Sequence, residues 1–340
     1  MKSKRLVIHA GFPKSGSTSI QVALKQNIRT LHASNTYVFD ADMNIAFDGI
    51  WRGIPPWRLE EMRRTNDIAS QIRQQMALCD GTAILTAENL CAERFPAHFT
   101  SLDHDLDIEI LFYFRPYGSA LPSSWQQWGT KAGLSLSDYL EKALLSKEPN
   151  HLKSLDAWQK ALPRAKITVI PFVTSGMMGG NPVTDFFSRL GCSFANASIR
   201  KGNASIDYSI VDLFYREHEQ LFKMPRVHPS SLLKLMLKAE YLSSNAPMIS
   251  NEWIKRIEDC FRDDSIAILT KYSDLQDVQA FYNIHFRTPP IKDLSYIEMD
   301  SRAVLIRAFT VLVDSFGEDS LSAALGAFLA EQITAQDPVA

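Results

Sequence analysis

A strand, a glycine-rich turn and a helix follow one another at the start of this chain. Residues 6–8, Leu-Val-Ile, form a short apolar run suited to a buried parallel strand, and apolar residues return at helical spacing over residues 20–25. Gly11, Pro13 and Gly16 interrupt both patterns. The first N–H groups of a helix lack intrahelical partners, and the helix dipole adds positive potential there. The turn is therefore predicted to bind an anion.

The position of the lysine separates this turn from the common nucleotide-triphosphate loop. A Walker A sequence places its lysine directly after the second glycine, whereas Lys14 precedes Gly16. Residues 13–18, Pro-Lys-Ser-Gly-Ser-Thr, resemble the 5′-phosphosulfate loop of sulfotransferases that use 3′-phosphoadenosine-5′-phosphosulfate (PAPS). Ser17 stands where that family more often has threonine, and both residues carry a hydroxyl.

Residues on either side of the loop extend the resemblance. His9 and Gly11 before it and Gln21 after it are similar to the version of the motif typical of the bacterial and glycan-type branch. The resemblance implies that Lys14 is catalytic, at the bridging oxygen of the donor. It also implies that the donor is bound by a run of loop residues: Pro13, Lys14, Ser15, Gly16, Ser17, Thr18 and Ser19.

A second motif follows the strongly apolar strand expected over residues 108–114. Arg115 and, eight residues later, Ser123 resemble the 3′-phosphate motif of the same family, R-x7-S-x-Y. A guanidinium fork and a hydroxyl both suit phosphate oxygens. Trp125 replaces the usual tyrosine, and Pro122 fits a helix if it lies in the first turn.

A basic loop supplies a third candidate contact with the donor. Arg200-Lys201-Gly202 resembles the segment that closes over the 3′-phosphate in the cytosolic branch of the family. Two adjacent cations beside a glycine suit a phosphate clamp, although pairs of this kind are also frequent on surfaces.

The base that takes the acceptor proton is less clearly marked. Glu88 follows the strand expected over residues 82–86, where open α/β sheets bind their ligands, and it is the first choice. The competing interpretation is that Glu88 caps the next helix. Asp40 and Asp42 are the alternative bases, and His9 is interpreted as a structural residue at a strand end.

The order of apolar segments predicts an α/β fold of three layers, with a central, mostly parallel sheet, a P-loop-like phosphate loop and a helical C-terminal part. We expect an α/β core over residues 1–222 and a helical region over 223–340. Alternatively, one domain continues to about residue 287, and residues 288–340 form a helical extension. The apolar spacing of that extension suits packing and also self-association as a homo-oligomer.

Composition limits the class of partner. The 340 residues are 46% hydrophobic and 22% charged with a net charge of −2, so no general affinity for nucleic acid is expected. The sequence lacks a signal-peptide pattern and an apolar run of about 18 residues, which predicts a cytoplasmic protein without a membrane segment. The four cysteines have no zinc-like spacing, and no metal is expected.

Taken with the resemblance, these features predict sulfuryl transfer from PAPS to a hydroxyl of a carbohydrate or glycolipid acceptor. A P-loop nucleotide kinase and a non-catalytic nucleotide-binding interaction protein are the alternatives. Four tryptophans are candidates for stacking on sugar rings, and they serve equally well as core residues: Trp51, Trp57, Trp125 and Trp128.

Overall fold

The computed structural model describes residues 4–46, 53–129, 132–192 and 249–288. The first of two compact units holds the described residues of Met1–Ala120, Lys147–Gly202 and Ile257–Thr288. The second holds those of Leu121–Ser146 and Asn203–Arg256. The domain boundary expected near residue 222 lies outside the described residues, as do residues 289–340.

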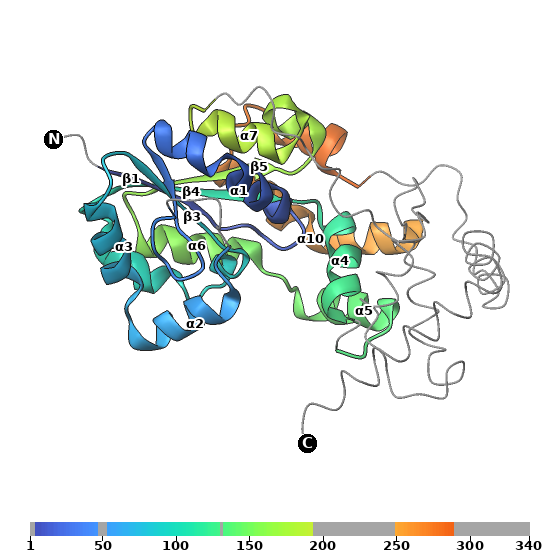
Figure 1. Ribbon diagram of the computed structural model, residues 1–340. Coiled ribbons are helices and arrows are strands. Elements are labelled where there is room, and N and C mark those ends of the chain that lie inside the picture. Colours follow the sequence, from blue (N-terminus) through green and yellow to red (C-terminus); the bar gives the residue numbers. More distant parts are fainter. Residues whose placement is uncertain (1–3, 47–52, 130–131, 193–248, 289–340) are drawn as a thin grey trace, which may run out of the picture. The chain divides into compact units, whose positions relative to one another are not determined.

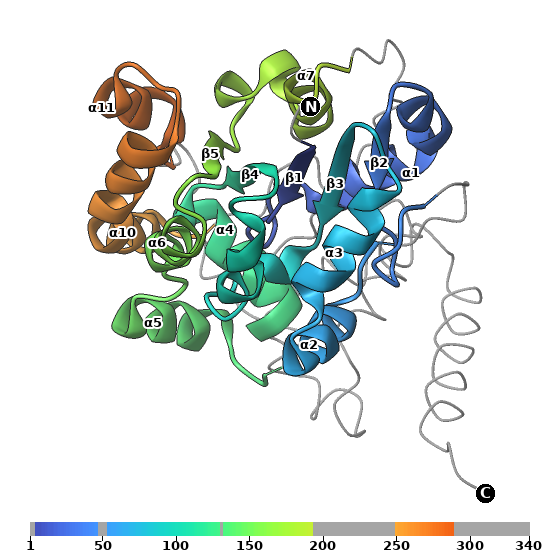
Figure 2. The same ribbon diagram turned by 90° about the vertical axis from the view of Figure 1, so that its left-hand side faces the viewer.

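A five-stranded parallel sheet forms the centre of the first unit, and its strands are ordered β2-β3-β1-β4-β5 (Figure 2). Leu6, Val7 and Ile8 are fully buried in β1, which explains their continuous apolar run. The strands are β1 Arg5–His9, β2 Thr36–Val38, β3 Thr82–Thr86, β4 Asp107–Phe114 and β5 Lys166–Pro171.

Helices cover both faces of this sheet, as right-handed crossovers between parallel strands require. The helices α1 (Ser17–Ala33) and α7 (Pro182–Arg189) lie on one face, and α3 (Ile68–Ala77) and α6 (His151–Ala161) lie on the other (Figure 1). The prediction of a three-layer α/β fold is confirmed. The other described α-helices are α2 Pro56–Thr65, α4 Tyr117–Ser124, α5 Leu136–Ser146, α10 Asn251–Tyr272 and α11 Val278–Phe281.

The core beneath α1 joins the sheet to both helices of that face. Val7 of β1 packs there with Ile20 and Leu24 of α1 and with Phe186 of α7, and all four side chains are fully buried. Burying four side chains of this size contributes about 1.5–3 kcal/mol each. The first turn of α1 is thereby fixed relative to the end of β1.

Two expectations about helices are wrong in detail. The apolar spacing of residues 58–78 predicts a single helix, but Asn66 adopts a left-handed conformation, with φ 58°, and separates α2 from α3. Asparagine tolerates this conformation better than most residues, so it ends the first helix. Pro122 lies in the interior of α4 and not in its first turn, and a π-helical turn, Trp125–Gly129, follows α4 directly.

Two other helix ends agree with the sequence pattern. The apolar spacing of residues 251–272 predicts a helix, and α10 has these bounds. The sequence also predicts that a short helix from residue 183 closes at Gly191; this helix is α7, and Gly191 follows its end with φ 74°. Glycine adopts this conformation without the steric penalty of a Cβ. The same spacing predicts helices over 210–222, 230–242 and 296–316 and a last apolar stretch over 321–333, and all of these lie outside the described residues.

Candidate functional site

The carboxyl ends of β1, β3 and β4 meet at one edge of the sheet. His9 is in register with Thr86 of β3 and with Leu111 of β4, and the Ala10 N–H donates to the Leu111 carbonyl at 3.1 Å. The chain leaves β1 toward β2 and leaves β4 toward β5, on opposite sides, so this is a topological switch point. Open parallel sheets bind ligands at such points.

The turn between β1 and α1 holds two residues in left-handed conformations. Lys14 has φ 65° and Gly16, the N-terminal flanking residue of α1, has φ 83°. The first helical hydrogen bond runs from the Ile20 N–H to the Gly16 carbonyl at 3.2 Å. The preceding N–H groups of α1 have no intrahelical acceptor, and no acidic residue lies in its first turn. This end of α1 therefore offers donors and positive potential.

Close packing on the outer side of the turn fixes its position. A Cβ atom at Gly16 would lie 2.8 Å from Phe172 Cε2, just after β5, and 2.9 Å from Pro182 Cγ, at the start of α7. Gly16 thus satisfies two requirements, a positive φ and a close approach to two rings. Contacts with Phe172, just after β5, and with Pro182 of α7 therefore support the turn.

Two buried hydroxyls inside the turn lack hydrogen-bond partners within the protein. Ser15 and Ser17 are 1% and 3% exposed, and neither Oγ atom has a partner. Ser17 Oγ lies so close to Gly11 that a Cβ there would overlap it. Buried polar groups normally find partners. Two unsatisfied hydroxyls beside an uncapped helix N-terminus indicate a site for a ligand with hydrogen-bond-accepting oxygens. Thr18 is exposed and Ser19 is half-buried in the same turn of α1.

Arg115 connects the two motifs that were identified separately in the sequence. It follows β4, and its Nη1 donates to the Lys14 carbonyl at 3.2 Å. Its Nε donates to Ser119 Oγ at 3.0 Å, and Ser119 Oγ in turn donates to the Pro116 carbonyl at 3.0 Å. These bonds hold the guanidinium against the phosphate-loop candidate.

The structure does not establish where the other residues expected at the 3′-phosphate lie relative to Arg115. Ser123 is 8% exposed near the end of α4 and belongs to the second unit, so its pairing with Arg115 stays a prediction. Arg200, Lys201 and Gly202 lie outside the described residues. Sequence reasoning missed Ser119, although its position one helical turn after Arg115 was a usable signal.

The candidate bases follow two different strands of the sheet. Glu88 is half-buried and begins a short 3₁₀ helix, Glu88–Cys91, just after β3, the neighbour of β1. Asp40 and Asp42 follow β2, which is one strand farther out. Neighbouring strands are about 4.8 Å apart, so β2 ends roughly 10 Å from β1.

Asp40 also has a local structural role. Its Oδ1 accepts the N–H groups of Asp42 and Asn44, both at 2.9 Å, and this closes the turn after β2. This oxygen of Asp40 is therefore already engaged in holding the turn.

His9 joins the ends of β1 and β3 beneath the turn. Its ring is fully buried, and Nδ1 lies 2.9 Å from Thr86 Oγ1. Burial lowers the pKa of His9 to about 4, so the ring is neutral at pH 7. Nε2 has no partner within the protein.

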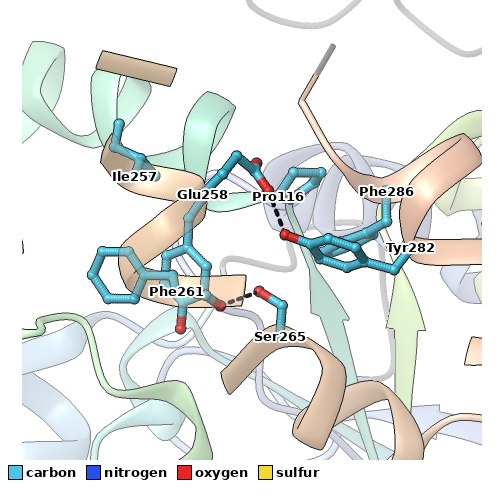
Figure 3. A pocket seen from close by; sticks show the side chains of 8 residues that line it. Pro116, Ile257, Glu258, Phe261, Ser265, Tyr282 and Phe286 are labelled. Atoms are coloured by element: carbon cyan, nitrogen blue, oxygen red, sulfur yellow. Dashed lines mark hydrogen bonds between the residues drawn. The ribbon is translucent and has the colours of Figure 1, made fainter. Parts of the chain in front are cut away.

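The segment around Arg115 is supported from α10 and from the residues after it. Tyr117 stacks on Phe261, with ring centroids 4.2 Å apart and an interplanar angle of 15°. Figure 3 shows Glu258 accepting a hydrogen bond from Tyr282, beside Pro116. Glu258 also accepts the Thr288 N–H at 3.2 Å. These contacts position the start of α4, and no motif in the sequence indicates them.

The tryptophans divide between core and surface. Trp125 is fully buried, and its Nε1 donates to the Leu134 carbonyl at 2.9 Å, so it is a core residue. Trp57, on the first turn of α2, is 65% exposed, and Trp128 is 50% exposed. Trp51 lies outside the described residues.

Comparison with protein-family models finds none that matches the chain, and comparison with curated proteins finds no match either. Within residues 4–46, 53–129, 132–192 and 249–288, no helix is long and apolar enough to cross a membrane. The same residues contain no group of three or more histidine, cysteine, aspartate or glutamate side chains arranged to hold a metal ion.

Proposed function

We propose that this protein is a PAPS-dependent sulfotransferase that transfers a sulfuryl group to a hydroxyl of a carbohydrate or glycolipid acceptor. The observation that carries the proposal is the hydrogen bond from Arg115 Nη1 to the Lys14 carbonyl, at 3.2 Å. It brings together the two sequence motifs that resemble the 5′- and 3′-phosphate sites of that family, from positions about 100 residues apart. The unsatisfied hydroxyls of Ser15 and Ser17 support an anion in the same turn.

The proposed reaction is an in-line transfer between two oxygens. The acceptor oxygen attacks the donor's sulfur, and the bond from sulfur to the bridging phosphate oxygen breaks. Negative charge develops on that bridging oxygen, where the Lys14 ammonium would stabilise it. The products are the sulfated acceptor and adenosine 3′,5′-bisphosphate.

The acceptor proton passes to a carboxylate in this scheme, and we assign that role to Glu88. It follows the strand next to β1, whereas Asp40 follows a more distant strand and is engaged by backbone N–H groups. Backbone donors at the start of α1 would hold the 5′-phosphate, and Arg115 would pair with the 3′-phosphate. Positioning and electrostatic stabilisation would supply most of the rate enhancement.

Transfer of labelled sulfate from PAPS to a panel of hydroxyl-bearing acceptors tests the proposal. Wild-type protein should label at least one acceptor, and Lys14→Ala should abolish transfer while the folded protein keeps its circular dichroism spectrum. A Lys14→Ala variant with wild-type turnover would refute the assignment. Failure of the wild type both to transfer sulfate and to bind adenosine 3′,5′-bisphosphate would refute the proposed function itself.

A further inference from the structure

A cleft of about 420 Å³ opens beside the turn that contains Lys14. Its lining includes Cys91, Glu93 and Arg94, which follow Glu88 in the chain. It also includes Glu148, from the segment before α6, and His151, the first residue of α6. Pro13 lies in the lining as well. A cleft of this volume accommodates one or two sugar rings, by comparison with ordinary ligand pockets of about 300–1,000 Å³.

Each reacting group of the proposed mechanism is a near neighbour in the chain of a residue that lines this cleft. Pro13 directly precedes Lys14 in the chain. Burial and then the nearby Glu88 carboxylate raise the pKa of the Cys91 thiol, which also lines the cleft, to about 12. Glu88 is therefore close enough to a lining residue to act on it electrostatically. An acceptor bound here would lie beside Lys14 and Glu88.

The charged side chains that line the cleft already have ion-pair or hydrogen-bond partners within the protein. Glu93 pairs with Lys153 at 2.9 Å, and Arg94 pairs with Glu60 of α2 at 2.5 Å. Glu148 accepts the Asn150 N–H at 2.8 Å. Acidic side chains outnumber basic ones in this set, so the cleft presents no surplus of positive charge to an anionic ligand.

His151 adds no charge to the lining. It is 6% exposed and packs against Phe12, with ring centroids 3.8 Å apart. Burial lowers its pKa to about 3, so it is neutral at pH 7. An aromatic ring, prolines and hydrogen-bonding groups without a surplus of positive charge suit a polyhydroxylated, uncharged molecule. An anionic acceptor would lose hydration here and meet two carboxylates of the lining, Glu93 and Glu148.

We propose that this cleft is the acceptor subsite and that it selects uncharged carbohydrates over those bearing carboxylate or sulfate groups. The inference rests on the proposed function and adds to it the charge class of the acceptor and the residues that contact it. Glu93 and Lys153 form the pair that sets the charge at its rim.

The selectivity is tested by comparing kcat/KM for neutral methyl glycosides and short neutral oligosaccharides with that for uronate-bearing counterparts of equal length. Neutral acceptors should be at least about tenfold better. Glu93→Gln removes the carboxylate that pairs with Lys153, so the ratio of kcat/KM for uronate-bearing acceptors to that for neutral ones should rise about fivefold. Equal or better use of uronate-bearing acceptors by the wild type would overturn the inference.

The location is tested by filling the cleft. Ala92 lies in its lining, and Ala92→Phe should raise the acceptor KM at least about tenfold while the affinity for adenosine 3′,5′-bisphosphate stays at the wild-type value. Ala97→Phe is the matched control, because Ala97 is exposed on the next 3₁₀ helix, Pro96–Leu102, and does not line the cleft.

An unchanged acceptor KM in Ala92→Phe would overturn the location. Absence of transfer to any neutral acceptor, in protein that binds the bisphosphate, would overturn the acceptor class while leaving donor binding intact. Absence of bisphosphate binding in the wild type would instead refute the underlying function. The two failures are thereby distinguished.

Discussion

Lowering the pH from 7 to 5 is expected to destabilise this protein through two buried histidines, His9 and His151. Burial lowers their pKa values to about 4 and about 3, from 6.5. In the unfolded chain both rings bind protons below pH 6.5, whereas the folded protein keeps them neutral down to those lower values. Their contribution to stability is therefore fully present above pH 6.5 and is lost as the pH falls.

The magnitude follows from the shifts in pKa. Each pH unit between the unfolded and folded pKa values costs about 1.4 kcal/mol per histidine. Between pH 7 and pH 5 each ring therefore removes about 2 kcal/mol, and the pair about 4 kcal/mol. A loss of that size is a large part of the 5–15 kcal/mol typical of a folded protein.

Urea unfolding followed by tryptophan fluorescence at pH 7 and pH 5 measures this loss. His151→Phe keeps an aromatic ring against Phe12 and Tyr117 but cannot take up a proton. Its loss between the two pH values should be about 2 kcal/mol smaller than that of the wild type. His285→Phe, at an exposed position, is the control and should behave as the wild type. Equal pH dependence in wild type and His151→Phe would refute the reasoning.

Three further predictions concern the turn and its neighbours. Gly16→Ala places a Cβ 2.8 Å from Phe172 at φ 83°, so it should cost about 1–3 kcal/mol in urea unfolding and weaken bisphosphate binding; an unchanged midpoint would contradict this packing. Arg115→Lys keeps the charge but loses the guanidinium fork, and calorimetry should show at least about tenfold weaker bisphosphate binding, unless Arg115 has no part in the site. Glu88→Gln should lower kcat about 100-fold with near-normal donor binding, whereas the same loss in Asp40→Asn would move the base to Asp40.

The parallel sheet could be predicted from the sequence because its strands are continuous apolar runs between glycine and proline signals. β3 was expected over residues 82–86, where it lies, and β1 and β4 extend at most one residue beyond the expected ranges. The break between α2 and α3 was missed because the apolar spacing continues through it. Leu59 and Met76, from different helices, are both buried in the same unit.

The site was predictable only as far as its residues occur in contiguous motifs. Lys14 and Arg115 were each identified from local sequence as parts of one donor site, but the hydrogen bond between them was not predicted. Contacts between segments far apart in the sequence carry no such signal. The pairing of Glu93 with Lys153 and the stacking of Tyr117 on Phe261 depend on how helices pack, and neither pair has a motif.

Thermal unfolding with two nucleotides tests the central claim most directly. Adenosine 3′,5′-bisphosphate without a metal ion should raise the melting temperature, because binding at 100 times Kd stabilises the folded state by about 2.7 kcal/mol. ATP with magnesium at the same concentration should not. Stabilisation by ATP with magnesium and none by the bisphosphate would contradict the assignment of Lys14 and Arg115 to a donor phosphorylated at both its 5′ and 3′ sides.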